Sequence, residues 1–273
     1  MPRTLSDLCV HTITTKPWSL ETAVEKYAVA GIRGISVWQD AAEAVGFARA
    51  GRILADSPLE VVSYVRGGFF PHSSAEKRAR ALDDNRRLID EAATIGAPLL
   101  VLVCGAEPQQ SLSESRRQIQ AGIESLIDHA SDQNVRLAIE PLHPMYADTR
   151  SAINSLGQAN DMTESIDHPQ VGIAVDVYHL WWDDQLEGEI LRCGNHDNLY
   201  AFHICDWKVP TTDMLLDRGL MGEGCIDVPL IRSWVQAAGF RGYHEVEIFS
   251  NEYWALDQDV FLDRITEAYR NHS

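Results

Sequence analysis

Asp176 ends an apolar stretch, VGIAVD, and His179 follows it three residues later. The stretch is typical of a buried strand, in which alternate residues share a face, so that Gly172, Ala174 and Asp176 point the same way. An unpaired charge is costly in a buried position. The carboxylate of Asp176 therefore predicts a functional site or, as the simpler alternative, a polar residue that marks where the strand leaves for a loop.

Three further apolar stretches deliver a polar residue in the same way: RLAIEPL carries Glu140, LYAFHICDW carries His203, and GYHEVEIFS carries Glu247. Four unrelated strand ends are the alternative, but together the four side chains form an oxygen-rich set with one imidazole. Such a set suits a hard or borderline divalent ion such as Mn²⁺, Mg²⁺ or Co²⁺, and differs from the cysteine-rich ligands of structural zinc sites. We therefore predict one divalent metal ion as the cofactor.

Residues late in the earlier strands are candidates for contact with a substrate. His11 lies near the end of the first strand, where an ordinary core histidine is the alternative. Arg66 ends the third strand before two glycines, and its guanidinium suits a hydroxyl, carboxylate or phosphate unless a neighbouring acid pairs with it. Trp38 ends the second strand, where it would stack on a sugar face or pack in the core.

Two more candidates follow the predicted metal ligands. His143 comes three residues after Glu140, where it would contact the ligands or the substrate, or else lie in a loop without a role. Asp206 comes three residues after His203. Because carboxylates commonly fix the orientation of a metal-bound imidazole, we expect Asp206 to orient His203 or to bind a substrate hydroxyl.

These residues are carried by strands that alternate with helices eight times along the chain. Strands are predicted over residues 8–15, 35–38, 59–68, 98–105, 136–142, 171–178, 199–207 and 244–250. Helices are predicted over residues 19–31, 41–56, 75–95, 112–130, 151–166, 187–193, 228–239 and 257–270. The alternation favours parallel pairing through right-handed crossovers.

Eight such units in 273 residues match a (β/α)8 TIM barrel in a single domain, residues 1–273. A doubly wound open sheet is the alternative fold, but no G-x-G-x-x-G motif follows a predicted strand. In a TIM barrel the chemistry lies at the carboxyl ends of the strands. The four candidate ligands come from the fifth to eighth strands, so we expect them to converge at one arc of that rim.

The composition of the chain limits the classes of partner that the protein can bind and the cellular compartment in which we expect it. The chain has 23 basic and 40 acidic residues and a formal charge of −17, which disfavours binding to a nucleic-acid backbone. Its five cysteines are widely spaced and form no C-x-x-C pair, which favours free thiols in a reducing compartment. No run of about 18 apolar residues occurs, nor a signal peptide. We expect a cytoplasmic protein that binds neither nucleic acid nor membrane.

Five motifs carry a resemblance to a known family: IEPLHP at 139–144, VDVYH at 175–179, FHICD at 202–206, GEGCID at 222–227 and VEIF at 246–249. Taken together, the chain resembles the xylose isomerase-like TIM barrels, the sugar phosphate isomerase/epimerase superfamily. The resemblance implies a single divalent ion held by Glu140, Asp176, His203 and Glu247. It also implies that Glu140 and Glu247 act as the acid/base pair, and that His179 contacts the substrate.

Glu245 shares a strand face with Glu247, so either could be the ligand. Glu247 lies nearer the carboxyl end of the strand and matches the family's E-x-F pattern. We therefore expect Glu247 to be the ligand and Glu245 to be an internal acid one layer deeper, with its hydrogen bonds satisfied.

The resemblance implies an isomerase or epimerase of a small ketose, polyol-derived ketone or oxidised sugar. The expected chemistry is removal of a proton next to a metal-bound carbonyl. A lyase or dehydratase that expels a β-substituent from a keto-sugar or keto-glycoside is the alternative. A non-catalytic metal- or sugar-binding barrel is a second alternative. The expected partner is a small carbohydrate, and a homo-oligomer is compatible with the sequence.

Overall fold

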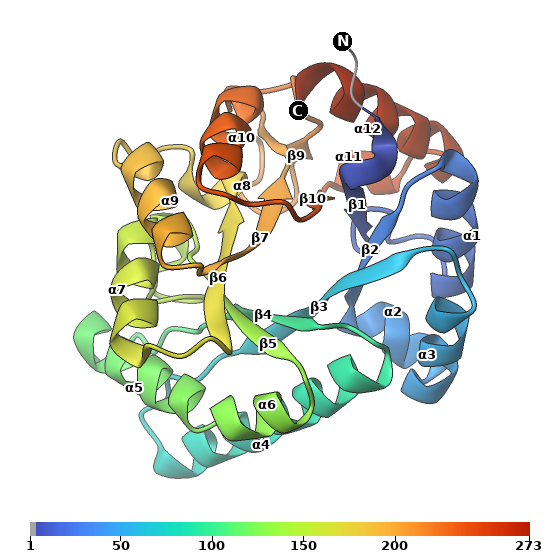
Figure 1. Ribbon diagram of the computed structural model, residues 1–273. Coiled ribbons are helices and arrows are strands. Elements are labelled where there is room, and N and C mark those ends of the chain that lie inside the picture. The colour runs from blue at the N-terminus through green and yellow to red at the C-terminus, as the bar shows by residue number, and fades with distance from the viewer. Residues whose placement is uncertain (1–3) are drawn as a thin grey trace.

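A closed barrel of parallel strands forms the centre of the molecule, and helices surround it (Figure 1). The structure is a computed structural model that describes residues 4–273. Within those residues the strand order around the barrel is β1-β10-β7-β6-β5-β4-β3-β2. The barrel strands are β1 (Leu8–His11), β2 (Gly34–Trp38), β3 (Glu60–Gly68), β4 (Leu99–Val103), β5 (Arg136–Glu140), β6 (Val171–Asp176), β7 (Leu199–Ile204) and β10 (His244–Val246). The predicted TIM barrel is therefore confirmed.

Helices follow the strands along the chain and form the outer ring. They are α1 (Leu20–Ala30), α2 (Gln39–Val45), α3 (Phe47–Ala55), α4 (Ala75–Thr94), α5 (Leu112–Glu124), α6 (Ile127–Asp132), α7 (Leu156–Ile166), α8 (Val177–Leu180), α9 (Leu186–Asn195), α10 (Val228–Ala237), α11 (Asn251–Trp254) and α12 (Gln258–His272), with 3-10 turns η1 (Leu5–Asp7) and η2 (Pro144–Tyr146). Serine side chains cap the amino ends of α1, α4, α5 and α7.

Two of the predicted helices are divided in the structure. The helix predicted over 41–56 is split into α2 and α3 at Gly46, whose φ of 81° interrupts helical geometry. The helix predicted over 112–130 is split into α5 and α6. Most predicted strands are also shorter than expected at their carboxyl ends, and the largest differences are at β1, which ends at His11, and β10, which ends at Val246. Apolar periodicity continues across these breaks, which is why the sequence pattern did not reveal them.

A short antiparallel ribbon follows β7, and its two strands come from the end of the predicted seventh strand and from the predicted loop after it. It pairs β8 (Asp206–Trp207) with β9 (Arg218–Gly219). Asp206 holds the far end of this segment, because its carboxylate accepts hydrogen bonds from the backbone N–H groups of Gly222, Gly224 and Ile226. The ribbon thereby places β9 beside the carboxyl ends of β6 and β10.

The interior of the barrel is filled by small and medium apolar side chains, including Ala138, Ala174 and Ala201 on three adjacent strands. A separate and much larger apolar core lies between the barrel and the helices. Small side chains in the barrel leave room above them for polar groups at the carboxyl ends of the strands.

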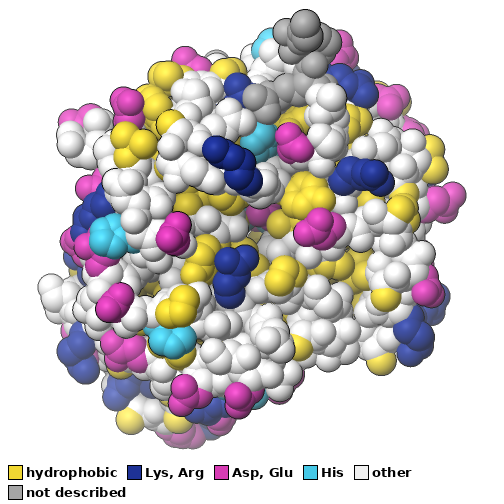
Figure 2. Space-filling model, viewed as in Figure 1, with side chains coloured by type: hydrophobic (Ala, Val, Ile, Leu, Met, Phe, Trp, Pro, Cys, Tyr) yellow, Lys and Arg dark blue, Asp and Glu magenta, His cyan; other side chains and the backbone are white. Residues whose placement is uncertain are grey.

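The outer surface is mixed in charge. Figure 2 shows acidic and basic side chains interspersed over the face in view, without a large patch of one sign. No helix among residues 4–273 has both the length and the apolar character needed to cross a membrane. The five cysteines are free thiols, and Cys225 alone is exposed.

Candidate metal centre

The four predicted metal ligands meet at the carboxyl end of the barrel. Glu140 ends β5, Asp176 ends β6, His203 lies in β7, and Glu247 directly follows β10. Each offers one ligand atom within 4.8 Å of the others. All four side chains are buried, with exposures of 4% or less. Parallel strands bring these residues together because their carboxyl ends share one rim.

His203 lies between two of the acids. Its Nδ1 is 2.9 Å from Oε1 of Glu140, and its Nε2 is 3.8 Å from Oε2 of Glu245. Burial opposes protonation of the ring, but the hydrogen bond to Glu140 and the charge of Glu245 outweigh it and raise the pKa of His203 to about 10. Both ring nitrogens of His203 therefore carry a hydrogen in the metal-free site, and the ring is positively charged.

Asp176 is fixed by the start of the following helix, α8, where it accepts a hydrogen bond of 2.7 Å from the backbone N–H of Tyr178. Burial raises the pKa of Asp176 to about 7; Arg218 opposes this shift, while Glu140 and Glu247 add to it. Like charges in a buried cluster cannot all ionise without a counter-charge. The three carboxylates can therefore all be ionised only when a cation is bound near them.

Arg218 supplies part of that counter-charge, and sequence analysis missed it. The residue is 3% exposed. Its Nη1 donates a hydrogen bond of 2.9 Å to Glu247 and lies 3.3 Å from Oδ2 of Asp176. Its guanidinium also lies over the rings of Tyr178 and Phe249, at 4.4 and 4.9 Å from their centroids. No local pattern distinguishes Arg218, because it reaches the site from the β8–β9 ribbon.

His11 and Trp38 lie next to Glu247. Nδ1 of His11 is 3.2 Å from Oε1 of Glu247, and the indole N–H of Trp38 donates to the same ring nitrogen over 3.2 Å. Burial alone would raise the pKa of Glu247, but His11 and Arg218 outweigh it and hold that pKa well below its usual range. Both predicted contact residues are thus in the wall of the site.

Glu245 lies one layer below the cluster, as expected. Its Oε2 accepts hydrogen bonds from Ser36 at 2.6 Å and Ser63 at 3.1 Å, and lies 3.1 Å from Nε2 of His11. The same oxygen faces Nε2 of His203, which has no hydrogen-bond partner within the described residues. Glu245 therefore occupies the position from which a carboxylate fixes a metal-bound imidazole.

His179 lies above Asp176, with Nε2 3.7 Å from Oδ2 of that residue. Nε2 accepts from Nη2 of Arg218 over 3.4 Å. Burial, followed by the charge of Arg218, lowers the pKa of His179 well below its usual value, so the ring is neutral. Since Nε2 accepts, the hydrogen lies on Nδ1, a buried atom without a partner within residues 4–273.

Two further predicted contact residues have partners outside the four-residue cluster. His143 packs against the rings of Trp207 and Trp182, at 5.4 and 5.8 Å between centroids, and its Nδ1 accepts from the backbone of Met145. The expectation that Asp206 orients His203 is wrong, because its carboxylate is engaged by the backbone of the ribbon segment. Glu245 takes the position expected for Asp206.

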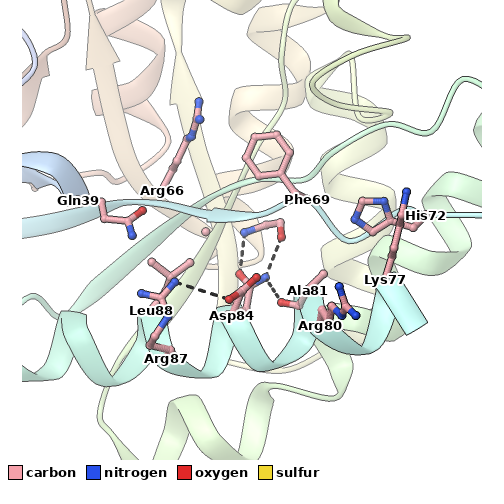
Figure 3. Close-up of a pocket in the computed structure, with 13 residues that line it drawn as sticks. Gln39, Arg66, Phe69, His72, Lys77, Arg80, Ala81, Asp84, Arg87 and Leu88 are labelled. Atoms are coloured by element: carbon pink, nitrogen blue, oxygen red, sulfur yellow. Dashed lines mark hydrogen bonds and ion pairs between the residues drawn. The ribbon is translucent and has the colours of Figure 1, made fainter. Parts of the chain in front are cut away.

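Arg66 is half-buried beside the cluster. Its guanidinium lies 5.9 Å from the ring centroid of Trp38 and 5.0 Å from that of Phe69. A cavity of about 390 Å³ is lined by the end of β3 and by α4 (Figure 3). Figure 3 shows the guanidinium of Arg66 pointing away from α4.

The residues present fit a divalent ion. Three buried carboxylates and one imidazole converge, with a single arginine among them, so a dication would neutralise the remaining charge. An oxygen-rich set with one nitrogen suits Mn²⁺, Mg²⁺ or Co²⁺ and also admits Zn²⁺.

Comparisons with known proteins agree with this architecture. Residues 24–265 match the family model described as xylose isomerase-like TIM barrel. The crystal structure of protein SMc04130 from Sinorhizobium meliloti 1021 superposes with a TM-score of 0.95 at 44% identity, covering 98% of this chain and 99% of that one. The crystal structure of an IolI protein with a bound zinc atom has a TM-score of 0.84 at 18% identity, covering 96% of each chain.

Curated relatives are more distant in sequence. Inosose isomerase of Bacillus velezensis is 23% identical over 205 residues, which are 73% of this chain and 71% of that protein. The 3-dehydroshikimate dehydratase of Pseudomonas putida is 24% identical over 245 residues, 87% of this chain but 37% of that longer protein.

Proposed function

Because the chain belongs to the xylose isomerase-like TIM barrel family, we propose that it is a divalent-metal-dependent isomerase or epimerase of a small ketose, polyol-derived ketone or oxidised sugar. The observation that carries the proposal is the buried convergence of Glu140, Asp176, His203 and Glu247 at the carboxyl rim of the barrel.

These four residues would hold the ion. When bound, a divalent ion supplies Lewis-acid polarisation of a carbonyl oxygen, which acidifies the neighbouring C–H. Glu245 and the serines below it keep the imidazole of His203 in one orientation from beneath. Mn²⁺, Mg²⁺ or Co²⁺ suits the predominance of carboxylate oxygen.

In this proposal Glu140 and Glu247 move a proton between two faces of a substrate. Glu140 ends β5 and Glu247 follows β10, and β6 and β7 lie between these strands in the barrel. A sugar carbon held over β6 and β7 would thus have one glutamate on each side. One glutamate takes the proton and the other, or the same one, returns it, which changes the configuration or the position of the carbonyl.

Two donors are available for substrate oxygens. The Nδ1–H of His179 is buried and has no partner within the described chain. The guanidinium of Arg218 lies between Asp176 and Glu247. Both are held by aromatic rings, since Tyr146 packs on His179 at 5.9 Å and Tyr178 lies under Arg218. Fixed donors of this kind hold the reacting carbon of a substrate close to the two glutamates of the acid/base pair.

The relatives support this reaction class and supply its alternative. One curated relative is named an isomerase and another a dehydratase. Both classes begin by removing a proton next to a carbonyl. A lyase differs only in expelling a β-substituent instead of returning the proton to carbon.

Turnover in deuterated water distinguishes these classes. We expect the Mn²⁺-loaded protein to incorporate deuterium into ketoses or keto-glycosides at one carbon, and Glu140→Gln and Glu247→Gln to abolish this exchange. An unsaturated product from a 3-keto-glycoside, with no activity on free ketoses, would identify a lyase. No exchange and no conversion with any substrate of the panel would leave a non-catalytic binding barrel.

A further inference from the structure

Arg66 is an arginine without an acidic partner beside an acid-rich site. Within residues 4–273 its guanidinium forms neither a hydrogen bond nor an ion pair, and the rings of Trp38 and Phe69 hold it instead. Aromatic faces orient a guanidinium while leaving its N–H edge free. The other basic side chains around the cavity beyond β3 include Arg80 and Arg87, which pair with Glu76 and Glu91 (Figure 3).

Arg150 is a second half-buried arginine of this kind on a neighbouring loop. Its guanidinium lies 5.5 Å from the ring centroid of Tyr146, and its side chain has no acidic partner in the described structure. Its carbonyl accepts a hydrogen bond of 2.8 Å from the backbone of Gly105. Gly105 in turn touches Phe69 so closely that a Cβ there would lie 2.7 Å from the Phe69 Cα. Gly105 therefore lies between the segment that follows Arg66 and the loop that carries Arg150.

Each arginine packs on an aromatic side chain that contacts a histidine next to the four-residue cluster. Trp38, which packs on Arg66, donates to His11, and His11 contacts Glu247. Tyr146, which packs on Arg150, contacts the ring of His179 next to Asp176. Arg66 lies near the carboxyl end of β3 and Arg150 in the loop that follows β5, so both belong to the same rim of the barrel as the cluster.

The two arginines also influence each other electrostatically. Burial lowers the pKa of Arg66, and the next largest influence is repulsion from Arg150; Glu140 and Glu247 act in the opposite direction. An anion bound to both guanidinium groups would offset their repulsion, and carboxylate and phosphate fit the fork of an arginine.

We propose that Arg66 and Arg150 together bind an oxyanion of the substrate, a carboxylate or a phosphate, while the rest of the substrate lies over Glu140 and Glu247. This inference rests on the proposed function and narrows it from carbohydrates in general to sugar acids or sugar phosphates.

The test compares three ligands that share a carbon skeleton: D-fructose, D-fructuronate and D-fructose 6-phosphate. Calorimetric titration of the Mn²⁺-loaded wild type should show at least tenfold tighter binding of one anionic ligand than of fructose. Arg66→Gln and Arg150→Gln should each weaken that binding by about ten- to a hundredfold, the range for one charge-assisted contact, and weaken fructose binding by a clearly smaller factor. Tighter binding of the uronate indicates a sugar acid, and tighter binding of the phosphate ester a sugar phosphate.

Arg80→Gln is the matched control, because it removes the same charge from an exposed position on α4. Equal affinity for all three ligands, binding of none of them, or equal weakening by Arg80→Gln would overturn the arginine site. Thermal melting of each variant verifies that it is folded. Deuterium exchange is measured separately: anion binding without exchange contradicts the proposed function alone, and exchange without charge preference contradicts this inference alone.

Discussion

Arg218 donates a hydrogen bond of 2.9 Å to Glu247, and both side chains are almost completely buried. The guanidinium thus neutralises one acid of a cluster that the sequence predicts as a metal site. A buried ion pair contributes little net stability, but removing one partner leaves an uncompensated charge. Arg218 therefore contributes most to the stability of the folded protein when no metal ion is bound.

Arg218→Met should separate metal binding from turnover. In the metal-free protein the change should lower the free energy of unfolding by about 3–5 kcal/mol, because Asp176 and Glu247 lose their cation. A divalent ion should restore most of that loss, and its affinity should be equal to or higher than in the wild type. Activity should fall by about a hundredfold or more, since a fixed donor is lost. Thermal melts with and without Mn²⁺, and initial rates, measure both effects.

Arg218→Lys serves as the control for charge. Lysine retains the cation but lacks the planar fork that reaches Glu247, Asp176 and His179 together. We expect near-normal stability with reduced activity. If Arg218→Met instead loses the metal ion, Arg218 positions the ligands rather than the substrate.

His203→Ala and Asp176→Asn should each remove most of the bound divalent ion and nearly all activity. Each change deletes one of the four converging ligand groups. Elemental analysis after dialysis against Mn²⁺ gives the occupancy. His143→Ala is a suitable control for metal occupancy, because His143 is a histidine outside the four converging ligand groups and its ring packs against Trp182 and Trp207. Full metal occupancy in His203→Ala would contradict the site.

Glu245→Gln and Glu247→Gln should have different consequences although the residues are two apart. Glu247→Gln removes a ligand and a proton carrier, so turnover should fall by more than the roughly two to four orders of magnitude expected for an acid/base group alone. Glu245→Gln disturbs the hydrogen bonds to Ser36 and His11, which should cost about 1–3 kcal/mol of stability. It should also weaken metal binding by about ten- to a hundredfold through His203. Melting temperatures and rates measured together would show the reverse pattern if Glu245 were the ligand.

The four-residue cluster was predictable because its signals are local. A polar side chain at the end of an apolar strand is visible in a few residues of sequence, and a parallel barrel brings all such ends to one rim. The alternation of strands and helices predicted that barrel without reference to side-chain packing. The deeper position of Glu245 followed from the same two-residue period.

Arg218 was not predictable by this reasoning, because its place depends on contacts between distant residues. It lies on β9, which is only two residues long, and pairs with β8 across an irregular loop. Asp206 fixes the end of that loop by binding backbone N–H groups 16 to 20 residues away. The same contacts explain why Asp206 is not beside His203. Backbone capture of this kind leaves no periodic pattern in the sequence.

Metal affinity should rise with pH, because the ion displaces protons from the site. The pKa of His203 is raised to about 10 and that of Asp176 to about 7. At pH below 7 both groups carry protons in the metal-free protein, and between pH 7 and 10 only His203 does. The ion requires the unprotonated ligands, so its binding should release about two protons per ion below pH 7 and about one above it.

The dissociation constant should therefore fall by about a hundredfold per pH unit below pH 7 and by about tenfold per unit from pH 7 to 9. Titrations with Mn²⁺ between pH 6 and 9 give the slope, and calorimetry in two buffers of different ionisation enthalpy counts the protons. Glu245→Gln is the informative comparison, because the charge of Glu245 helps to raise the pKa of His203. Loss of the Glu245 charge should lower the pKa of His203, so the dissociation constant for Mn²⁺ should depend less on pH above pH 7. The pH dependence that Asp176 causes below pH 7 should remain. A slope that is flat in the wild type would show that His203 is neutral before the ion binds, and would contradict the assignment of its proton to the Glu140 and Glu245 contacts.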